Sequence, residues 1–275
     1  MNDRPIRNLE ALAAAIPDGA KLAIPADYSG VAMAATRALI RRGAKNLHLV
    51  CVPTSGLQAD MLIGAGAAAI VETSAVTLGE FGRAPRFNEA VRLGKIEIRD
   101  STCPAIHAGL QAAEKGLPFM PIRGILGADL LANRRDWKVI DNPFAEGDPI
   151  VVVPSITPDV ALFHAPLADR EGNVWIGRRR ELMSMAHAAK RTLATVESIS
   201  ETSLFADESL AAGVIPAIYV EAVVEARRGA RPLGLWDAYE ADDAFLAKYA
   251  ANAETEAGFA ETLEPWLAGS PLAAE

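Results

Sequence analysis

The feature that most constrains this chain is an alternation of short apolar runs with longer helical stretches, which begins near its amino end. Residues 21–24 and 47–51 are apolar runs, and residues 31–42 between them carry apolar side chains on one helical face. This alternation is typical of a βαβ unit, in which a helix joins two parallel strands. The sequence therefore predicts an α/β fold with an open, mostly parallel sheet and flanking helices.

The alternation continues over most of the remaining chain. Further helices are expected at residues 8–16, 59–63, 88–93, 105–115, 183–189 and 242–267. Further strands are expected at residues 67–71, 96–98, 150–153, 160–163, 192–196 and 217–224. The runs at 150–153 and 160–163 are almost continuously apolar, as buried parallel strands are. A turn at residues 169–172 predicts a hairpin into residues 174–176.

One segment breaks the pattern. Residues 117–148 contain several Pro and Gly residues and show no sustained period, so we expect an irregular excursion from a single domain that spans residues 1–275. The segment is rich in apolar side chains, including Trp137 and Phe144, that no helical or strand period would bury. Clustered apolar groups predict a subunit interface; the alternative is that the segment folds back over the chain's own sheet.

Composition excludes several classes of function. The 275 residues carry a net charge of -8 and give an isoelectric point near 5.2, which argues against nucleic-acid binding and against a basic membrane-surface role. No apolar stretch approaches the roughly 20 residues of a membrane span, and no secretory signal begins the chain. The cytoplasm is the expected location. Two cysteines do not make a disulfide framework.

Two loops follow predicted parallel strands and begin helices, which is where open α/β sheets bind ligands. We expect the substrate-binding residues in these two loops: Pro25, Ala26, Asp27, Tyr28, Ser29 and Gly30 in the first, and Thr54, Ser55 and Gly56 in the second.

No complete catalytic set is evident. The sequence has no phosphate-loop or dinucleotide glycine fingerprint, and its His, Cys, Asp and Glu residues lack metal-ligand spacing. Glu80 lies in a glycine-flanked loop and could be catalytic, or it could be a solvated loop acid. Cys103, at a predicted helix start, could be a nucleophile. His164 ends an apolar strand, where a hydrogen-bonded structural role is expected. Three consecutive arginines, residues 178–180, could meet a phosphate or carboxylate, or form an ordinary surface.

A series of short segments, in a specific order over nearly the whole chain, resembles the α subunit of class I coenzyme A transferases, closest to the type of the glutaconate CoA-transferase A subunit. These segments are Ala23-Ile24 with the following loop, Asp60-Met-Leu-Ile-Gly64, Gly116-Leu-Pro-Phe-Met-Pro121, Asp141-Asn-Pro-Phe144, Pro158-Asp-Val-Ala-Leu-Phe-His-Ala165, Asp169 to Gly172, Glu197-Ser-Ile199 and Gly229-Ala-Arg-Pro232.

The resemblance implies a heteromer of related α and β subunits, α2β2 or larger, that acts on a coenzyme A thioester as substrate and needs no tightly bound cofactor. In the family a glutamate attacks the acyl-CoA and forms a glutamyl-CoA thioester, and in heteromeric members that glutamate usually belongs to the β subunit. The resemblance therefore implies a CoA transferase that is inactive without its partner. Relatives commonly carry Gly-Gly-Phe after the first strand, where this chain has Pro25-Ala26-Asp27.

Three other functions stay open. A second branch of the family hydrolyses a ring in steroid-derived CoA thioesters with an α-subunit glutamate, which would fall near residues 100–103, where this chain has none. The chain could instead be a non-catalytic scaffold for its partner. A sugar-phosphate isomerase would need acid and base carboxylates and a phosphate loop, and neither pattern is convincing here.

Overall fold

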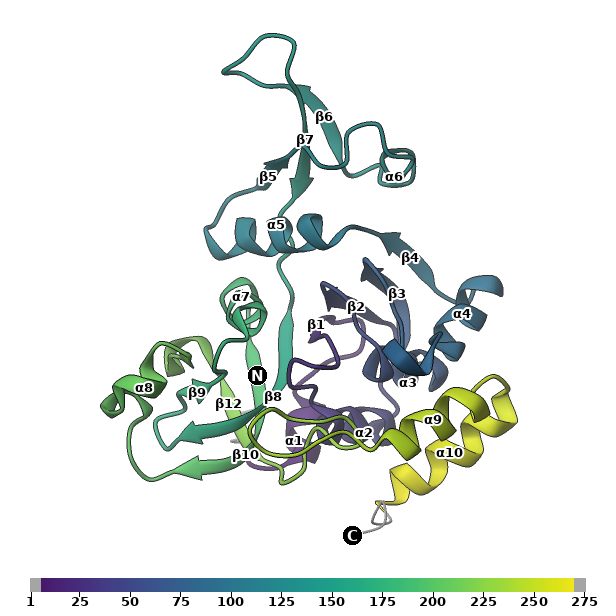
Figure 1. Cartoon of the computed structure of the whole chain (residues 1–275), viewed down its shortest axis with the longest axis vertical. Helices are drawn as coiled ribbons and strands as arrows, with labels where there is room; N and C mark the ends of the chain where they lie inside the picture. Colours follow the sequence, from purple (N-terminus) through teal and green to yellow (C-terminus); the bar gives the residue numbers. More distant parts are fainter. Residues whose placement is uncertain (1–5, 270–275) are drawn as a thin grey trace.

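A mostly parallel sheet of nine strands occupies the centre of the protein in a computed structural model that describes residues 6–269 (Figure 1). The predicted α/β fold is confirmed. The parallel strands are β1 (Lys21–Pro25), β2 (Leu47–Val52), β3 (Ala68–Thr73), β4 (Glu97–Asp100), β8 (Val160–Asp169), β10 (Thr192–Ser200) and β12 (Ala222–Glu225). Strands β9 (Val174–Trp175) and β11 (Val214–Ile215) extend one side antiparallel.

The helices cover both faces of this sheet. Outside the segment 117–148, the helices in residues 6–269 are α1 (Leu9–Ala14), α2 (Met33–Arg42), α3 (Leu57–Gly64), α4 (Pro85–Arg92), α5 (Cys103–Glu114), α7 (Arg180–Ala188), α8 (Glu208–Ala211), α9 (Asp243–Asn252) and α10 (Glu256–Ala268). The residues between them include single turns of 3-10 helix at Gly79–Phe81, Leu204–Ala206 and Ala217–Tyr219. No helix in residues 6–269 is both long and apolar enough to cross a membrane.

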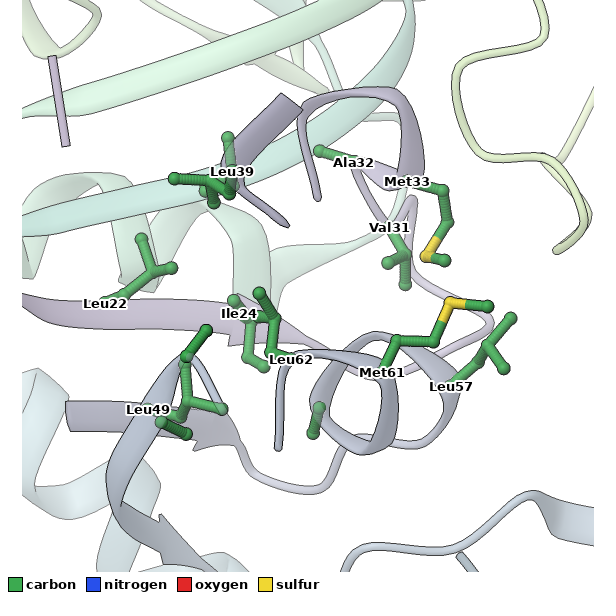
Figure 2. Close-up of a cluster of buried hydrophobic side chains, with 14 of the residues drawn as sticks. Leu22, Ile24, Val31, Ala32, Met33, Leu39, Leu49, Leu57, Met61 and Leu62 are labelled. Atoms are coloured by element: carbon green, nitrogen blue, oxygen red, sulfur yellow. The ribbon is translucent and has the colours of Figure 1, made fainter. Parts of the chain in front are cut away.

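The two covered faces explain why the central strands are apolar without alternation. Leu22 and Ile24 of β1 pack in one buried cluster with Met61 and Leu62 of α3 (Figure 2). Ala23, between them, points to a second cluster that α5 and α7 complete on the opposite face. Since both faces are removed from water, the four buried positions of β1 after Lys21 are all apolar.

Local signals place the ends of two helices where the sequence predicts them. The Asn8 side chain caps α1, and its Oδ1 accepts a hydrogen bond from the Ala11 N–H at 2.8 Å. Gly43 ends α2 with a φ of 73°, the left-handed conformation that glycine adopts without steric cost. The predicted hairpin is also confirmed, because β8 and β9 pair antiparallel across the turn at residues 169–172.

The strand prediction for residues 150–153 is right, but its parallel pairing is wrong. This segment is β7 (Pro149–Pro154), the middle of a separate antiparallel sheet between β5 (Phe119–Ile122) and β6 (Lys138–Asp141). Val151 and Val153 pack toward α5, and Ile150 on the other side is only 8% exposed. An apolar run indicates that a strand is buried, but burial does not determine whether the strand pairs parallel or antiparallel with its neighbours.

The segment 117–148 is more regular than predicted. It contains β5, β6 and the short helix α6 (Leu130–Asn133), and it packs over α5, which lies between the two sheets (Figure 1). Ile125 and Trp137 are buried there within the chain itself. For these two side chains the fold-back alternative is the correct one, whereas Phe119 and Phe144 stay exposed.

Arg134 fastens this segment to the central sheet. Its Nη2 lies 2.9 Å from Oε1 of Glu72 on β3, and its Nη1 donates a hydrogen bond of 3.0 Å to the Asp100 carbonyl at the end of β4. The guanidinium also stacks on Trp137, with 4.4 Å between Cζ and the ring centroid. A buried ion pair, a backbone contact and a stacked ring together fix where the small sheet sits.

Two further predictions need correction. The strand expected at 217–224 is a 3-10 turn at Ala217–Tyr219 followed by β12, because the chain bends before it joins the sheet. The single helix expected at 242–267 is two helices, α9 and α10. Thr255 interrupts it, since its side chain caps α10 by accepting a hydrogen bond from the Gly258 N–H at 3.1 Å.

Replacing Trp137 by Ala is expected to lower the free energy of unfolding by about 3–5 kcal/mol, because the indole is 6% exposed and its loss leaves a cavity under the small sheet. Urea unfolding of the purified chain measures the change. Phe144→Ala is the matched control, since that ring is 93% exposed, and its effect should stay within about 0.5 kcal/mol. Equal effects of the two substitutions would contradict this packing.

Candidate active site

A cavity of about 830 Å³ opens at the carboxyl ends of β1 and β2. Its walls are the loop after β1, the loop after β2, the turn at 77–81 after β3, Arg179, and a long loop at 233–241 that leads into α9. Parallel strands end at the same edge of a sheet, so the first two loops lie next to each other. The volume is within the range of small-molecule sites.

The residues predicted for substrate binding divide into two groups. Six of them line the cavity: Ala26, Asp27, Tyr28, Thr54, Ser55 and Gly56. The remaining three, Pro25, Ser29 and Gly30, lie behind the wall. Tyr28 is 73% exposed at the cavity's rim, whereas Ala26 and Ser55 are each only 2% exposed.

Ser29 and Gly30 hold the first loop in place. The buried Ser29 hydroxyl donates a hydrogen bond to Oε1 of Glu181 on α7. Gly30 has a φ of +76°, and a Cβ there would lie 2.1 Å from the His164 carbonyl oxygen. Only glycine fits this approach, in which the Gly30 carbonyl accepts a hydrogen bond of 2.7 Å from the His164 N–H.

Asp27 is the carboxylate that faces the cavity from the first loop. Its Oδ2 accepts a hydrogen bond from the Leu57 N–H at 3.0 Å, at the start of α3. A Cβ at Gly56 would lie 2.2 Å from this oxygen, so the carboxylate occupies the space a side chain would need. Burial raises the pKa of Asp27, and the Leu57 and Gly56 N–H groups act to lower it. Burial is the larger effect, so the pKa is raised to about 6.

Glu197 anchors the far wall, residues 233–241. It accepts hydrogen bonds from the Tyr239 hydroxyl at 2.7 Å and from the Arg228 N–H at 2.7 Å. Its Oε1 also lies 2.8 Å from Nε2 of the fully buried His164. Burial acts to raise the pKa of Glu197, but these hydrogen bonds outweigh it and lower the pKa to about 2. The carboxylate therefore stays ionised and keeps the wall attached.

The structure places the other residues that the sequence suggested, His164, Glu80 and Cys103, outside the cavity lining. His164 is satisfied on both ring nitrogens, with Nδ1 2.8 Å from the Thr195 hydroxyl, so its predicted structural role is confirmed. Glu80 is exposed on the turn at Gly79–Phe81, where Gly79 and Phe81 face the cavity. Cys103 is exposed at the start of α5, with Sγ 3.2 Å from the Ser74 hydroxyl.

Sequence reasoning missed most of the far wall. Arg179 lines the cavity and stacks over Trp236, with 3.8 Å between its Cζ and the ring centroid. The arginine run at 178–180 is the signal that points to this position. The composition of residues 233–241 does not mark them as site residues. They reach the cavity because Tyr239 is bound to Glu197, which lies 42 positions earlier in the chain. The part of the chain at 6–269 holds no group of three metal-ligating side chains.

Titration of Asp27 should appear in the stability of the chain. Its pKa is raised in the folded state, so the favourable contribution of the protonated form is lost as pH rises from about 4 to about 6. Relative to Asp27→Asn, wild type should lose about 2–3 kcal/mol across that window. Urea unfolding at pH 4 and pH 7 measures the difference. Asp60, whose pKa is also raised to about 6, titrates in both proteins and cancels. A difference independent of pH would contradict the burial of Asp27.

Comparison with known proteins identifies the family of this chain. The coenzyme A transferase family model matches residues 7–226. The A subunit of the 3-oxoadipate CoA-transferase of Pseudomonas knackmussii is 32% identical over 95% of this chain and 92% of its own length. The crystal structure of glutaconate coenzyme A-transferase from Acidaminococcus fermentans superposes with a TM-score of 0.86 at 28% identity, over 98% of this chain and 90% of that one.

The crystal structure of a variant of the decarboxylase AibA/AibB superposes with a TM-score of 0.82 at 31% identity, over 96% of this chain and all of that one. The family model covers residues 7–226, and the relative and the two structures each cover 95% or more of the chain. The protein belongs to the coenzyme A transferase family and is of the A-subunit type found in its heteromeric members.

Proposed function

We propose that this chain, acting as one domain, is the A subunit of a heteromeric enzyme that moves coenzyme A between an acyl-CoA and a carboxylic acid. The observation that carries the proposal is the cavity at the carboxyl ends of β1 and β2, in a chain of the A-subunit type. Its volume suits an acyl group, and its walls are mostly apolar around a few polar side chains. The acyl-CoA is a substrate here, and the proposal includes no tightly bound cofactor.

The nucleophilic glutamate is proposed to come from a partner β subunit. Of the glutamates in the described part of the chain, Glu240 lines the cavity, and it is exposed on the loop at 233–241. An exposed carboxylate on a loop is a solvated and weak nucleophile, and the same holds for Glu80. Asp27 is short and bound to the Leu57 N–H. The exposed Tyr28 at the rim leaves a surface that a partner could complete.

Decarboxylation of a CoA thioester is the second candidate. It is favoured by the similarity to AibA/AibB together with Asp27, a carboxylate that lines the cavity. A hydrolase of the steroid ring-opening type is a weaker candidate. Residues 100–103, where its glutamate would lie, end β4 and begin α5, and the side chain of Thr102 caps that helix.

The exposed face of the small sheet is proposed as part of the partner interface. Phe119 and Ile140 lie on the side of this sheet that faces away from α5, and they are 45% and 40% exposed. Phe144 extends the apolar surface nearby. Such a patch is unusual on a lone surface and common at association sites.

The first test separates the subunits. The purified chain alone should exchange no coenzyme A between acyl-CoA donors and carboxylate acceptors, while the chain copurified with its partner should. In the assembled enzyme, acyl-CoA should form the glutamyl-CoA thioester on the partner and not on Glu240, because the partner supplies the nucleophile. Turnover by the single chain, or a glutamyl-CoA thioester found on this chain by mass spectrometry, would overturn the split site. Release of carbon dioxide without exchange would favour the decarboxylase.

The second test concerns assembly. Phe119→Asp and Ile140→Asp should each weaken binding of the partner at least about tenfold, since a charge in the apolar centre of an interface loses its hydration. Analytical ultracentrifugation with the partner measures the change, and circular dichroism checks the fold. Phe205→Asp is the control, because Phe205 is 47% exposed on a different part of the chain. Assembly at wild-type affinity would move the interface elsewhere.

A further inference from the structure

Two buried side-chain oxygens at the cavity wall have no hydrogen-bond partner among residues 6–269. They are Oδ1 of Asp27 and Oγ of Ser55. Both residues line the cavity, from neighbouring loops at the ends of the paired strands β1 and β2. A buried polar atom without a hydrogen-bond partner is unfavourable. Two such atoms at one wall therefore favour binding of a ligand that brings a polar group to them.

The surroundings of these atoms hold them in place. Oδ2 of Asp27 is bound to the Leu57 N–H, and the absence of a side chain at Gly56 leaves room for the carboxyl. The Ser55 N–H donates to the Ala75 carbonyl, and the Ser55 carbonyl accepts from the Thr77 N–H at 3.0 Å. Backbone hydrogen bonds on both sides fix Ser55, so its hydroxyl has only rotation about χ1 left.

We infer that Asp27 and Ser55 form a polar subsite that binds a hydroxyl group on the acyl chain, so that the enzyme acts on hydroxyacyl-CoA thioesters. This inference rests on the proposed function for the identity of the ligand. A hydroxyl both donates and accepts, so it can donate to the Asp27 carboxylate while it accepts from Ser55. Both oxygens are buried, so contact requires the Ser55 hydroxyl to rotate about χ1 and the Asp27 carboxyl to turn toward the cavity, and side-chain rotamer changes of this kind are common when ligands bind.

Other acyl substituents match the pair less well. A keto oxygen only accepts, so it has nothing to offer an ionised carboxylate. A second carboxylate would be repelled by Asp27, as like charges at one site are. A plain alkyl chain would leave both atoms without partners inside an apolar wall. Above pH 6, where Asp27 is ionised, the hydrogen bond from a hydroxyl is charge-assisted and at its strongest.

Binding of two non-reactive thioethers tests the inference without turnover. S-(3-hydroxybutyl)-CoA and S-butyl-CoA differ by one hydroxyl. Calorimetry at about pH 7.5 measures the dissociation constant of each compound. The protein is the complex of this chain with its partner, or the purified chain if the two do not assemble. Wild type should bind the hydroxylated compound at least about tenfold more tightly. Ser55→Ala and Asp27→Ala should each reduce that preference to about threefold or less.

The Asp27→Asn variant separates a binding role from a structural one. Its amide can still hydrogen-bond a hydroxyl, so it should retain more of the preference than Asp27→Ala does. Equal affinities of wild type for the two thioethers, or an unchanged preference in Ser55→Ala, would overturn the inference. Exchange assays on the same preparations report on the proposed function separately. A complex that prefers the hydroxylated thioether but exchanges no coenzyme A keeps the subsite and rejects the transferase.

Discussion

The burial of the parallel sheet on both faces is the constraint on which the rest of the structure depends. Cluster formation on each side leaves no room for polar side chains along the middle of β1 and β2, so polar groups collect where the strands end. The backbone N–H at the start of α3 is directed toward the same edge. The rigid centre and the polar rim are thus one consequence of double coverage, and the candidate site lies at that rim.

Polar contacts then bring distant parts of the chain to this edge. Glu197, on β10, holds the loop at 233–241 through the Tyr239 hydroxyl and the turn before that loop through the Arg228 N–H. Arg134 attaches the small sheet to β3 and β4. Both anchors are partly or fully buried charges with additional hydrogen bonds, the arrangement in which removal of one partner is most damaging. The cavity wall and the proposed interface therefore depend on separate anchors.

How much could be predicted from the sequence follows from the range of each interaction. Double coverage leaves continuous apolar runs, and Asn8 and Gly43 act on their own helix ends, so the central fold was predictable. The loops at 25–30 and 54–56 were predictable because they follow strands directly. The far wall was not, since its position depends on Glu197, and the direction of β7 was not, since burial alone does not encode pairing.

The contact between Asp27 and Gly56 links two positions on neighbouring loops. While a carboxylate occupies position 27, no side chain can be placed at position 56, because its first carbon would stand 2.2 Å from Oδ2. The Thr77 carbonyl oxygen would stand 2.5 Å from the same carbon, so position 56 must stay glycine even when the carboxylate at position 27 is removed. Position 27 can therefore vary while position 56 cannot, since the backbone of the turn after β3 sets the limit at position 56.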